Sequence, residues 1–225
     1  MMDEKLTHFI YKNNIRFTGF HIMVDLHGIK FNENLEYVRN TMIQSVQSCN
    51  ATILQEHAHY FDGIAKGISG NIILAESHCT YHSWFEDNNK LICDYYMCGN
   101  ANPFNALEVL KNNFQPQFVK FNVLTRGPEV LLKEENLKYY VYCLIDPRNK
   151  KIFYVGKGSE NGVKEVLKYT KNKEKNNIIK SIKKDNLLPM IYYITSNTTE
   201  ELALFIETQM INFYGDILCN IPSAR

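Results

Sequence analysis

The first half of the chain reads as short strands interrupted by two amphipathic helices. Residues 16–26 are rich in β-branched and aromatic side chains and predict a strand. Five more segments read as strands: 51–56, 70–75, 78–84, 91–97 and 118–124. Apolar side chains at helical spacing predict a helix over about 33–49 and a second helix that Pro103 opens. The order β-α-β-β-β-β-α-β predicts an α+β fold, a two-layer arrangement in which a mainly antiparallel sheet carries both helices on one face.

The second half of the chain has a different pattern and predicts a small α/β domain. Residues 138–146 and 151–156 predict a hairpin around a turn-rich Pro-Arg-Asn-Lys tetrapeptide. The elements expected after it are a Lys-rich helical region over about 160–184, a third strand over 190–195 and a helix over 200–214. Thr198 or Thr199 can cap the last helix.

The distribution of charge supports two unlike domains. The 225-residue chain has a net charge of +1, which favours no particular class of partner. Residues 1–127 contain 10 basic and 12 acidic side chains and all seven histidines, whereas residues 128–225 contain 15 basic and 12 acidic side chains. The mixed, charged residues 128–137 fit a linker. We therefore expect a first domain over 1–127 and a second over 138–225.

Cysteine spacing and hydropathy argue against a protein that binds zinc through cysteines, is secreted or spans a membrane. The six cysteines form no Cys-x-x-Cys pair and show no zinc-ligand spacing. The chain has no long apolar stretch of the kind that signal peptides and membrane spans need. We expect a cytoplasmic protein with free thiols and no membrane association.

Short motifs in the first domain carry the strongest functional signal. They are Gly-x-His at 19–21 with Asp25, Gly-Ile-Ser-Gly at 67–70, Ala-Glu-Ser-His at 75–78, Tyr-His-Ser-Trp-Phe-Glu at 81–86 and Cys-Gly at 98–99. In this order they resemble the prokaryotic S-adenosylmethionine decarboxylase family over about residues 16–127. The resemblance implies a proenzyme that makes its own pyruvoyl cofactor from Ser77.

Self-processing of this kind needs a serine, an attackable peptide bond and a base. Ser77 Oγ would attack the Glu76 carbonyl, and removal of the Ser77 α-proton would then split the resulting ester by elimination. A histidine suits the second step because its pKa lies near neutrality. The resemblance assigns that proton acceptor to His82 and gives Ser69 a role in processing. Ser77 and His82 have opposite parity along a strand, so we expect a bend between them.

The resemblance also assigns the residues of the decarboxylation itself. The pyruvoyl ketone would form a Schiff base with the substrate amine and act as an electron sink. Cys98 would return a proton to the substrate, Phe61 would stack on adenine near the sulfonium, and Glu86 would bind the ribose hydroxyls. The resemblance further implies a homodimer with active sites near the interface and a product used in spermidine synthesis.

The first domain departs from the family pattern near its substrate residues. The family has proline where Phe85 stands, and this chain has extra residues at 63–66 and in the 87–90 turn. A pyruvoyl-dependent arginine or ornithine decarboxylase is therefore an alternative. The alternative from another class is a nucleic-acid-binding protein or nuclease whose first domain has lost its activity. The complete Ser69, Ser77, His82 and Cys98 set argues against the latter.

The second domain carries motifs of a different superfamily. Tyr-Val-Tyr at 140–142 and Phe-Tyr-Val-Gly-Lys-Gly at 153–158 resemble the GIY-YIG nucleases over about 138–221. The resemblance implies that Tyr142, Tyr154 and a Mg²⁺-binding Glu207 would activate water against a phosphodiester, with Asn220 as the late asparagine.

The expected arginine of that superfamily is missing. This chain has Gly162 near its position and no histidine near Val166, so we expect little or no nuclease activity. A set of lysines could still contact a nucleic-acid backbone weakly, although such runs are more often solvated helix faces. The set comprises Lys164, Lys168, Lys171, Lys173, Lys175, Lys180, Lys183 and Lys184.

Overall fold

The chain divides into two compact units, residues 1–130 and 131–225. The computed structural model describes residues 10–12, 15–30, 33–127, 137–159, 166–167 and 170–220. The predicted linker lies outside these residues except for its last position, as do Gly162, Lys164 and Lys168. No helix within the described ranges combines the length and the apolar character needed to cross a membrane.

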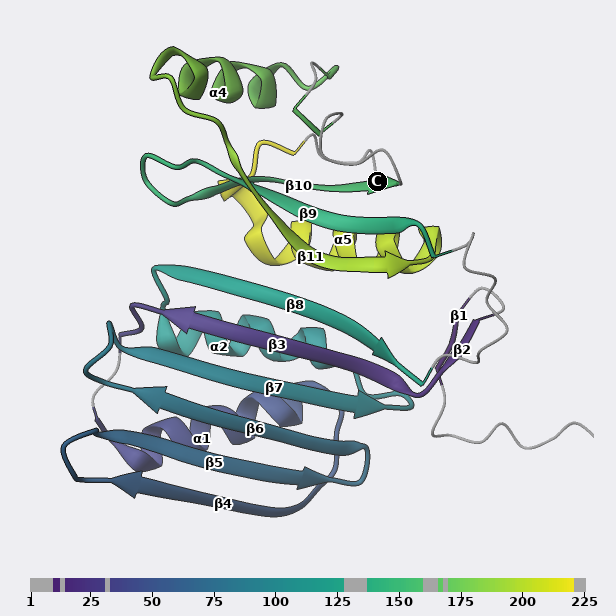
Figure 1. Cartoon of the computed structure of the whole chain (residues 1–225). Helices are drawn as coiled ribbons and strands as arrows, with labels where there is room; N and C mark the ends of the chain where they lie inside the picture. Colours follow the sequence, from purple (N-terminus) through teal and green to yellow (C-terminus); the bar gives the residue numbers. More distant parts are fainter. Residues whose placement is uncertain are drawn as a thin grey trace, which may run out of the picture. The chain divides into compact units, whose positions relative to one another are not determined.

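The first unit is built on a six-stranded antiparallel sheet with strand order β4-β5-β6-β7-β3-β8 (Figure 1). The strands are β3 (Gly19–His27), β4 (Ile53–Phe61), β5 (Gly67–Leu74), β6 (Ser77–Trp84), β7 (Lys90–Cys98) and β8 (Phe118–Arg126). Two further short strands, β1 (Ile10–Lys12) and β2 (Ile15–Phe17), pair with each other. The predicted antiparallel α+β arrangement is confirmed.

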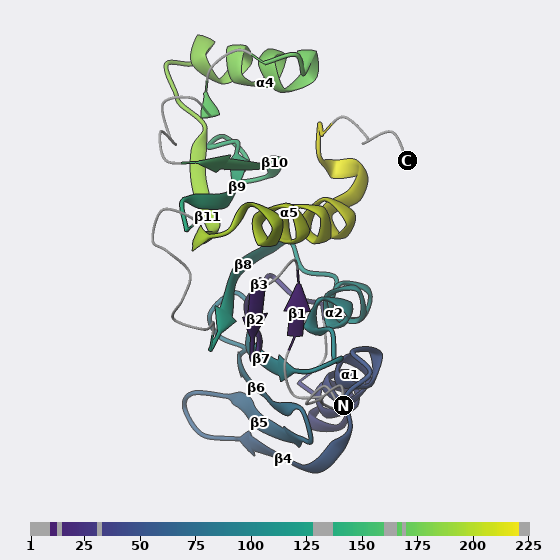
Figure 2. The same cartoon turned by 90° about the vertical axis from the view of Figure 1, so that its right-hand side faces the viewer.

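Two helices cover one face of this sheet (Figure 2). Helix α1 (Leu35–Ser48) begins at Asn34, whose side chain accepts a hydrogen bond from the Tyr37 N–H at 3.0 Å. The turn η1 (Pro103–Asn105) precedes α2 (Ala106–Phe114), so Pro103 opens a 3-10 turn that leads into the predicted helix.

Strand alternation places the core between the helices and the sheet. On β3, Ile22, Val24 and Leu26 are buried, whereas the side chains between them are half-buried. We call the face of the sheet opposite to α1 and α2 the outer face. Its side chains include Phe61, Ile73, Trp84 and Leu124, each 39–46% exposed, so the outer face leaves large apolar groups in contact with solvent in one chain.

The second unit is a three-stranded antiparallel sheet with strand order β10-β9-β11. Its elements are β9 (Tyr139–Ile145), β10 (Ile152–Ser159), α4 (Lys173–Lys184), β11 (Met190–Thr198), α5 (Glu200–Tyr214) and η3 (Gly215–Ile217). The Thr199 side chain accepts from the Leu202 N–H and begins α5 as predicted. The predicted helical region over 160–184 is too long, because 170–172 are not helical and Asn172 caps α4.

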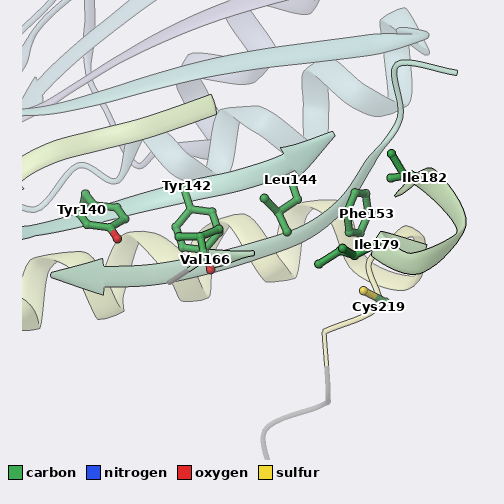
Figure 3. Close-up of a cluster of buried hydrophobic side chains, with 8 residues drawn as sticks. All are labelled: Tyr140, Tyr142, Leu144, Phe153, Val166, Ile179, Ile182 and Cys219. Carbon is green, nitrogen blue, oxygen red and sulfur yellow. The ribbon is translucent and has the colours of Figure 1, made fainter. Parts of the chain in front are cut away.

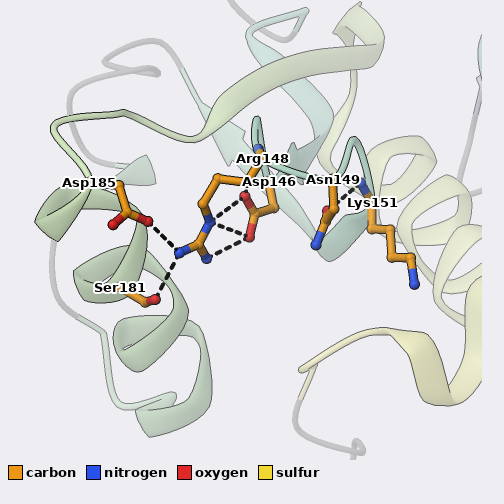
Figure 4. Close-up of polar contacts among 6 residues, drawn as sticks. All are labelled: Asp146, Arg148, Asn149, Lys151, Ser181 and Asp185. Carbon is orange, nitrogen blue, oxygen red and sulfur yellow. Dashed lines mark hydrogen bonds and ion pairs between the residues drawn. The ribbon is translucent and has the colours of Figure 1, made fainter.

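A cluster of buried apolar side chains holds the second unit together (Figure 3). It comprises Tyr140, Tyr142, Leu144, Phe153, Val166, Ile179, Ile182 and Cys219. The tetrapeptide after β9 is tied to the end of α4 by one guanidinium (Figure 4). Arg148 binds the buried Asp146 carboxylate at 2.7 Å, the Ser181 hydroxyl of α4 at 2.9 Å, and at 2.8 Å the carboxylate of Asp185, the residue that caps the end of α4.

Candidate active site

The Glu76–Ser77 peptide lies in a tight turn between two neighbouring strands. Strand β5 ends at Leu74, β6 begins at Ser77, and these two residues pair across the hairpin. Thr52, which precedes β4, makes two hydrogen bonds to this turn. Its carbonyl accepts a hydrogen bond from the Ala75 N–H at 3.0 Å, and its N–H donates one to the Glu76 carboxylate at 2.8 Å. The peptide bond expected to break is therefore fixed in space at one end of the sheet.

The backbone at this turn is strained and its carbonyl is polarised. Ser77 has a φ of 137°, a backbone conformation that residues other than glycine rarely adopt. Such a residue costs about 1–3 kcal/mol and persists only where its surroundings enforce it. The Glu76 carbonyl accepts a hydrogen bond from the Cys98 N–H at 2.9 Å. This donor would stabilise negative charge on the oxygen if a nucleophile attacked the carbonyl carbon.

The predicted bend between Ser77 and His82 is wrong. Strand β6 pairs with β5 and β7 without a register shift, and its ladder with β7 runs unbroken from Ser77 to Trp84. The irregular residue is Ser77 itself. Five residues of regular strand separate the Cα atoms of Ser77 and His82 by about 17 Å. The side chain beside the Ser77 hydroxyl is instead His78, whose Nδ1 lies 3.0 Å from Ser77 Oγ.

A second group of predicted residues gathers at the other end of the sheet. Ser69 pairs with His82 across β5 and β6, and Ser69 Oγ lies 2.5 Å from His82 Nδ1. Phe61 lies on the neighbouring strand β4, is 46% exposed, and meets the His59 ring edge-on at 4.6 Å. The Trp84 ring lies 5.7 Å from that of His82. An exposed aromatic side chain is thus available for stacking on the side of the Ser69–His82 pair.

Glu86 is held by the backbone of the segment that precedes β5. Its carboxylate accepts a hydrogen bond from the Lys66 N–H, and the Phe85 N–H donates to the Lys66 carbonyl at 3.4 Å. The extra residues at 63–66 therefore end in direct contact with the predicted ribose-binding carboxylate. This contact occupies one lone pair of Glu86 and leaves the other oxygen for a ligand.

Cys98 lies beside the Glu76–Ser77 turn and not beside the Ser69–His82 pair. It ends β7, pairs with Gly19 on β3, and donates its N–H to Glu76 as described above. The thiol is half-buried, and burial raises the pKa of Cys98 above its ordinary value. A thiol that keeps its proton at neutral pH suits a proton donor.

The outer face contains every described histidine of the chain. They are His21, His27, His57, His59, His78 and His82, all at outward-facing strand positions. His21 connects Asp94, at 3.3 Å from its Nε2, with Arg126, at 3.2 Å from its Nδ1. The sequence motifs include His78 but assign it no role, although its side chain lies next to that of the serine expected to react.

The second unit brings its predicted tyrosines and glutamate together. The rings of Tyr142 and Tyr154 lie 6.2 Å apart beside Gly156, where a Cβ would come within 3 Å of both. Glu207 accepts from the Lys157 N–H at 2.9 Å, and burial raises the pKa of this carboxyl. Burial also raises the pKa of both tyrosines, with Glu207 as a further cause for each.

Two other residues of this unit make contacts that the sequence did not predict. Asn220 accepts from the Val155 N–H at 3.0 Å and donates to its carbonyl at 2.7 Å, so both ends of the amide extend the hydrogen bonding of β10. Lys175 is not solvated. It is 2% exposed, and its Nζ lies 4.1 Å from the centre of the Tyr154 ring, a cation–π contact.

The structure gives no support for a Mg²⁺ site. Among the described residues, no group of three or more histidine, cysteine, aspartate or glutamate side chains is placed to hold a metal ion. Glu207 also has one of its oxygens engaged by the Lys157 N–H. The assignment of Glu207 as a Mg²⁺ ligand therefore stays a prediction.

Comparison with known proteins assigns the first unit. The family model described as S-adenosylmethionine decarboxylase matches residues 20–127. An S-adenosylmethionine decarboxylase proenzyme from Persephonella marina is 33% identical over 119 residues, which cover 52% of this chain and 87% of the relative. The proenzyme from Clostridium botulinum is 30% identical over 116 residues, 50% of this chain and 97% of the relative. The crystal structure of the adenosylmethionine decarboxylase from Aquifex aeolicus is 27% identical, with a TM-score of 0.43, over 48% of this chain and 90% of that one.

Proposed function

This chain belongs to the S-adenosylmethionine decarboxylase family, and from that premise we propose that it cleaves itself between Glu76 and Ser77 and supplies the aminopropyl donor for spermidine synthesis. Its class is that of a pyruvoyl-dependent carboxy-lyase made as a proenzyme. The observation that carries the proposed cleavage site is the hairpin turn. There the reacting serine has a strained backbone, and the carbonyl it would attack accepts the Cys98 N–H.

The proposed processing uses strain and charge stabilisation together. Attack of Ser77 Oγ on the Glu76 carbonyl converts the strained amide into an ester and releases the Ser77 nitrogen as an amine. Freeing that nitrogen relaxes the backbone torsion at φ 137°, which favours the shift. The Cys98 N–H stabilises the oxyanion that forms during attack. His82 then takes the Ser77 α-proton, and the ester breaks by elimination.

In the decarboxylation, the chain's own residues bind substrate and return a proton. The pyruvoyl group supplies an electron sink for loss of the carboxylate. Cys98 donates the proton to the substrate carbon, which its raised pKa supports. We assign adenine stacking to the exposed ring of Phe61 and ribose binding to the free oxygen of Glu86.

We further propose that the working enzyme is a homodimer in which outer face packs on outer face. Within one chain, His82 lies about 17 Å along a straight strand from Ser77, too far for proton transfer. A two-fold axis that runs across the strands places the Ser77 end of one β6 over the His82 end of the other. Facing sheets pack about 10 Å apart, within reach of side chains from both. Burial of the exposed apolar groups Phe61, Ile73 and Trp84 would favour such packing.

Denaturing mass spectrometry of the purified protein tests the processing. The expected fragments are residues 1–76 and 77–225, with the larger one blocked by a pyruvoyl group. Ser77→Ala is expected to remain one chain of 225 residues. Cleavage of the alanine variant, or cleavage of the natural chain at another bond, would overturn the assignment of Ser77.

Mixing two inactive variants tests the dimer. Ser77→Ala retains the base but lacks the nucleophile, and His82→Ala retains the nucleophile but lacks the base. We expect co-expression of the two to restore cleavage of the His82→Ala chain, identified by a tag. The control replaces the first chain by Ser77→Ala with His82→Ala, which should give no rescue. Cleavage that fails in both mixtures would mean that each chain processes itself.

The substrate is tested by release of carbon dioxide from S-adenosylmethionine, arginine and ornithine side by side. We expect S-adenosylmethionine to react fastest, because Phe61 offers a stacking surface that neither free amino acid uses. Phe61→Leu should therefore raise KM for S-adenosylmethionine. Turnover of arginine or ornithine alone would refute the substrate and favour the alternative decarboxylase.

For the second unit we propose weak nucleic-acid binding without efficient cleavage. The proximity of Tyr142, Tyr154 and Glu207 supports a relation to a phosphodiester site. The glycine at position 162, where the superfamily has an arginine, argues against efficient catalysis, and the burial of Lys175 beside the Tyr154 ring removes one lysine from the set that could contact a phosphate backbone.

A further inference from the structure

We propose that His78 is the catalytic base of the first processing step and deprotonates Ser77 Oγ as it attacks the Glu76 carbonyl. This assignment deepens the proposed self-processing and rests on it. It divides the two proton transfers of maturation between two histidines of β6. His78 acts on the hydroxyl of its own chain, and His82 acts later on the α-carbon.

The contact between the two side chains carries the proposal. His78 Nδ1 lies 3.0 Å from Ser77 Oγ, within the range that general-base catalysis requires. Neighbouring residues of a regular strand point to opposite faces, so this contact depends on the unusual torsion of Ser77. The torsion that strains the scissile bond therefore also brings the serine hydroxyl to an imidazole.

The surroundings of His78 keep its ring in one place. The ring meets Tyr96 of β7 nearly perpendicularly, with centroids 5.8 Å apart. The guanidinium of Arg126, from β8, lies over the ring of Tyr96, 5.3 Å from the ring centre. Ile73 of β5 is the cross-strand neighbour of His78. The contact with the Tyr96 ring restricts the His78 side chain, which therefore presents its nitrogen with a smaller loss of rotamer freedom during the reaction.

The charges around His78 favour its neutral form. Burial lowers the pKa of His78, and the His21 and Arg126 charges lower it further, whereas Asp94 acts in the opposite direction. The groups that face it are His21 from β3, Asp94 and Tyr96 from β7, Arg126 from β8 and the apolar Ile73 from β5. A neutral imidazole at pH 7 is the form that can accept the hydroxyl proton.

The proposed step is balanced within the two residues and the peptide. In the tautomer with a proton on Nε2, His78 Nδ1 accepts the Ser77 Oγ proton while Oγ bonds to the Glu76 carbonyl carbon. The bond between that carbon and the Ser77 nitrogen then breaks. The imidazolium returns its proton to the departing nitrogen, which leaves as a neutral amine. The products are an ester and neutral His78, with no other reactant consumed.

Trapping with hydroxylamine separates the two histidines. Hydroxylamine at neutral pH and room temperature cleaves an ester and leaves peptide bonds intact, including Asn161–Gly162, which it attacks only under alkaline, heated conditions. Freshly synthesised His78→Ala is expected to stay as an uncleaved, hydroxylamine-resistant chain, because it stops before the ester. His82→Ala is expected to stay uncleaved but to break at residue 77 on treatment. The rate loss for His78→Ala should be about 10²–10⁴-fold, the usual contribution of a general base.

Three controls separate catalysis from structure. Thr80→Ala changes the next outward-facing position of β6 and should process at the natural rate. His78→Gln keeps a polar side chain of similar length and should process as slowly as His78→Ala, which guards against a folding defect in the alanine variant. Added imidazole should accelerate the processing of His78→Ala but not of Ser77→Ala.

The pH dependence of processing gives a further test. The processing rate of the natural chain should fall as pH drops through a pKa below the ordinary 6.5 of histidine, and this dependence should vanish in His78→Gln.

Processing of His78→Ala and His78→Gln at the natural rate would overturn the proposal. So would a hydroxylamine-sensitive ester in either variant, because the first step would then proceed without His78. Failure of the natural chain to cleave at residue 77 is a different result, which would refute the proposed self-processing itself.

Discussion

The strain at Ser77 can be measured by comparing two variants that both lack the nucleophile. Ser77→Ala keeps a Cβ at φ 137°, whereas Ser77→Gly removes it. Relief of an unfavourable backbone conformation is worth about 1–3 kcal/mol. Glycine costs about 0.5–1 kcal/mol relative to alanine through its greater freedom in the unfolded chain. The glycine variant should therefore be more stable than the alanine variant, by up to about 2.5 kcal/mol.

Urea unfolding followed by tryptophan fluorescence measures this difference in the free energy of unfolding for the first structural unit. Trp84 is the one tryptophan of the chain and ends β6, so its signal reports the first unit. Both variants remain uncleaved, so the comparison is between chains of equal covalent structure. The matched control is Thr80→Gly against Thr80→Ala, each in the Ser77→Ala background. At this regular strand position glycine should be less stable by about 0.5–1 kcal/mol.

The sign of the two differences is the decisive result. Opposite signs at residues 77 and 80 are expected if the turn stores backbone strain. A Ser77→Gly chain that is less stable than Ser77→Ala by the same amount as the control would refute the reasoning. The driving force for the acyl shift would then have to come from the Cys98 N–H and the base alone.

The remaining roles can be tested as follows. Cys98→Ala keeps the N–H that holds Glu76 and should self-cleave, but mass spectrometry should detect cofactor inactivated by wrong protonation, with carbon dioxide release reduced about 10²-fold or more; full activity would exclude the thiol. In the natural enzyme, any loss of activity caused by ionisation of Cys98 should begin only above the pH at which an ordinary cysteine thiol ionises, since burial raises the pKa of that thiol. A chain lacking residues 138–225 should process and decarboxylate normally, and the full chain should cut plasmid DNA slowly or not at all with Mg²⁺. Efficient cleavage of DNA by the full chain that disappears in Glu207→Ala would show instead that the second unit is an active nuclease.

The order of strands and helices could be predicted because each element carries a local signal. Alternation on β3 and the spacing of apolar residues on α1 reflect burial on one face, which is a property of the segment itself. The ends of α5 were also predictable, since Thr199 is a cap whose partner lies three residues away. Strand β4 extends five residues beyond its predicted end, because its outward-facing histidines and Phe61 break the apolar pattern without ending the ladder.

The arrangement of the site could not be predicted from the motifs alone. The sequence brings Ser77 and His82 within five residues, but the ladder of β6 holds them at opposite ends of a strand. The torsion of Ser77 depends on the two-residue turn and on its contacts with Thr52, which lies 25 positions earlier. Lys175 was predicted to be solvated because its helix is rich in lysine. Its burial depends on the ring of Tyr154, which another strand supplies.

The two histidines of β6 give the two processing steps different dependences on protein concentration. His78 touches the hydroxyl of its own chain, so formation of the ester requires one molecule. His82 lies far from Ser77 of its own chain, so elimination requires the proposed second copy. Dilution below the dimer dissociation constant should therefore leave the first rate unchanged and slow the second. A hydroxylamine-sensitive, uncleaved chain should accumulate on dilution and disappear when the protein is concentrated. If the precursor accumulates in a hydroxylamine-resistant form instead, the first step also needs the dimer. If dilution has no effect, each chain completes both steps alone.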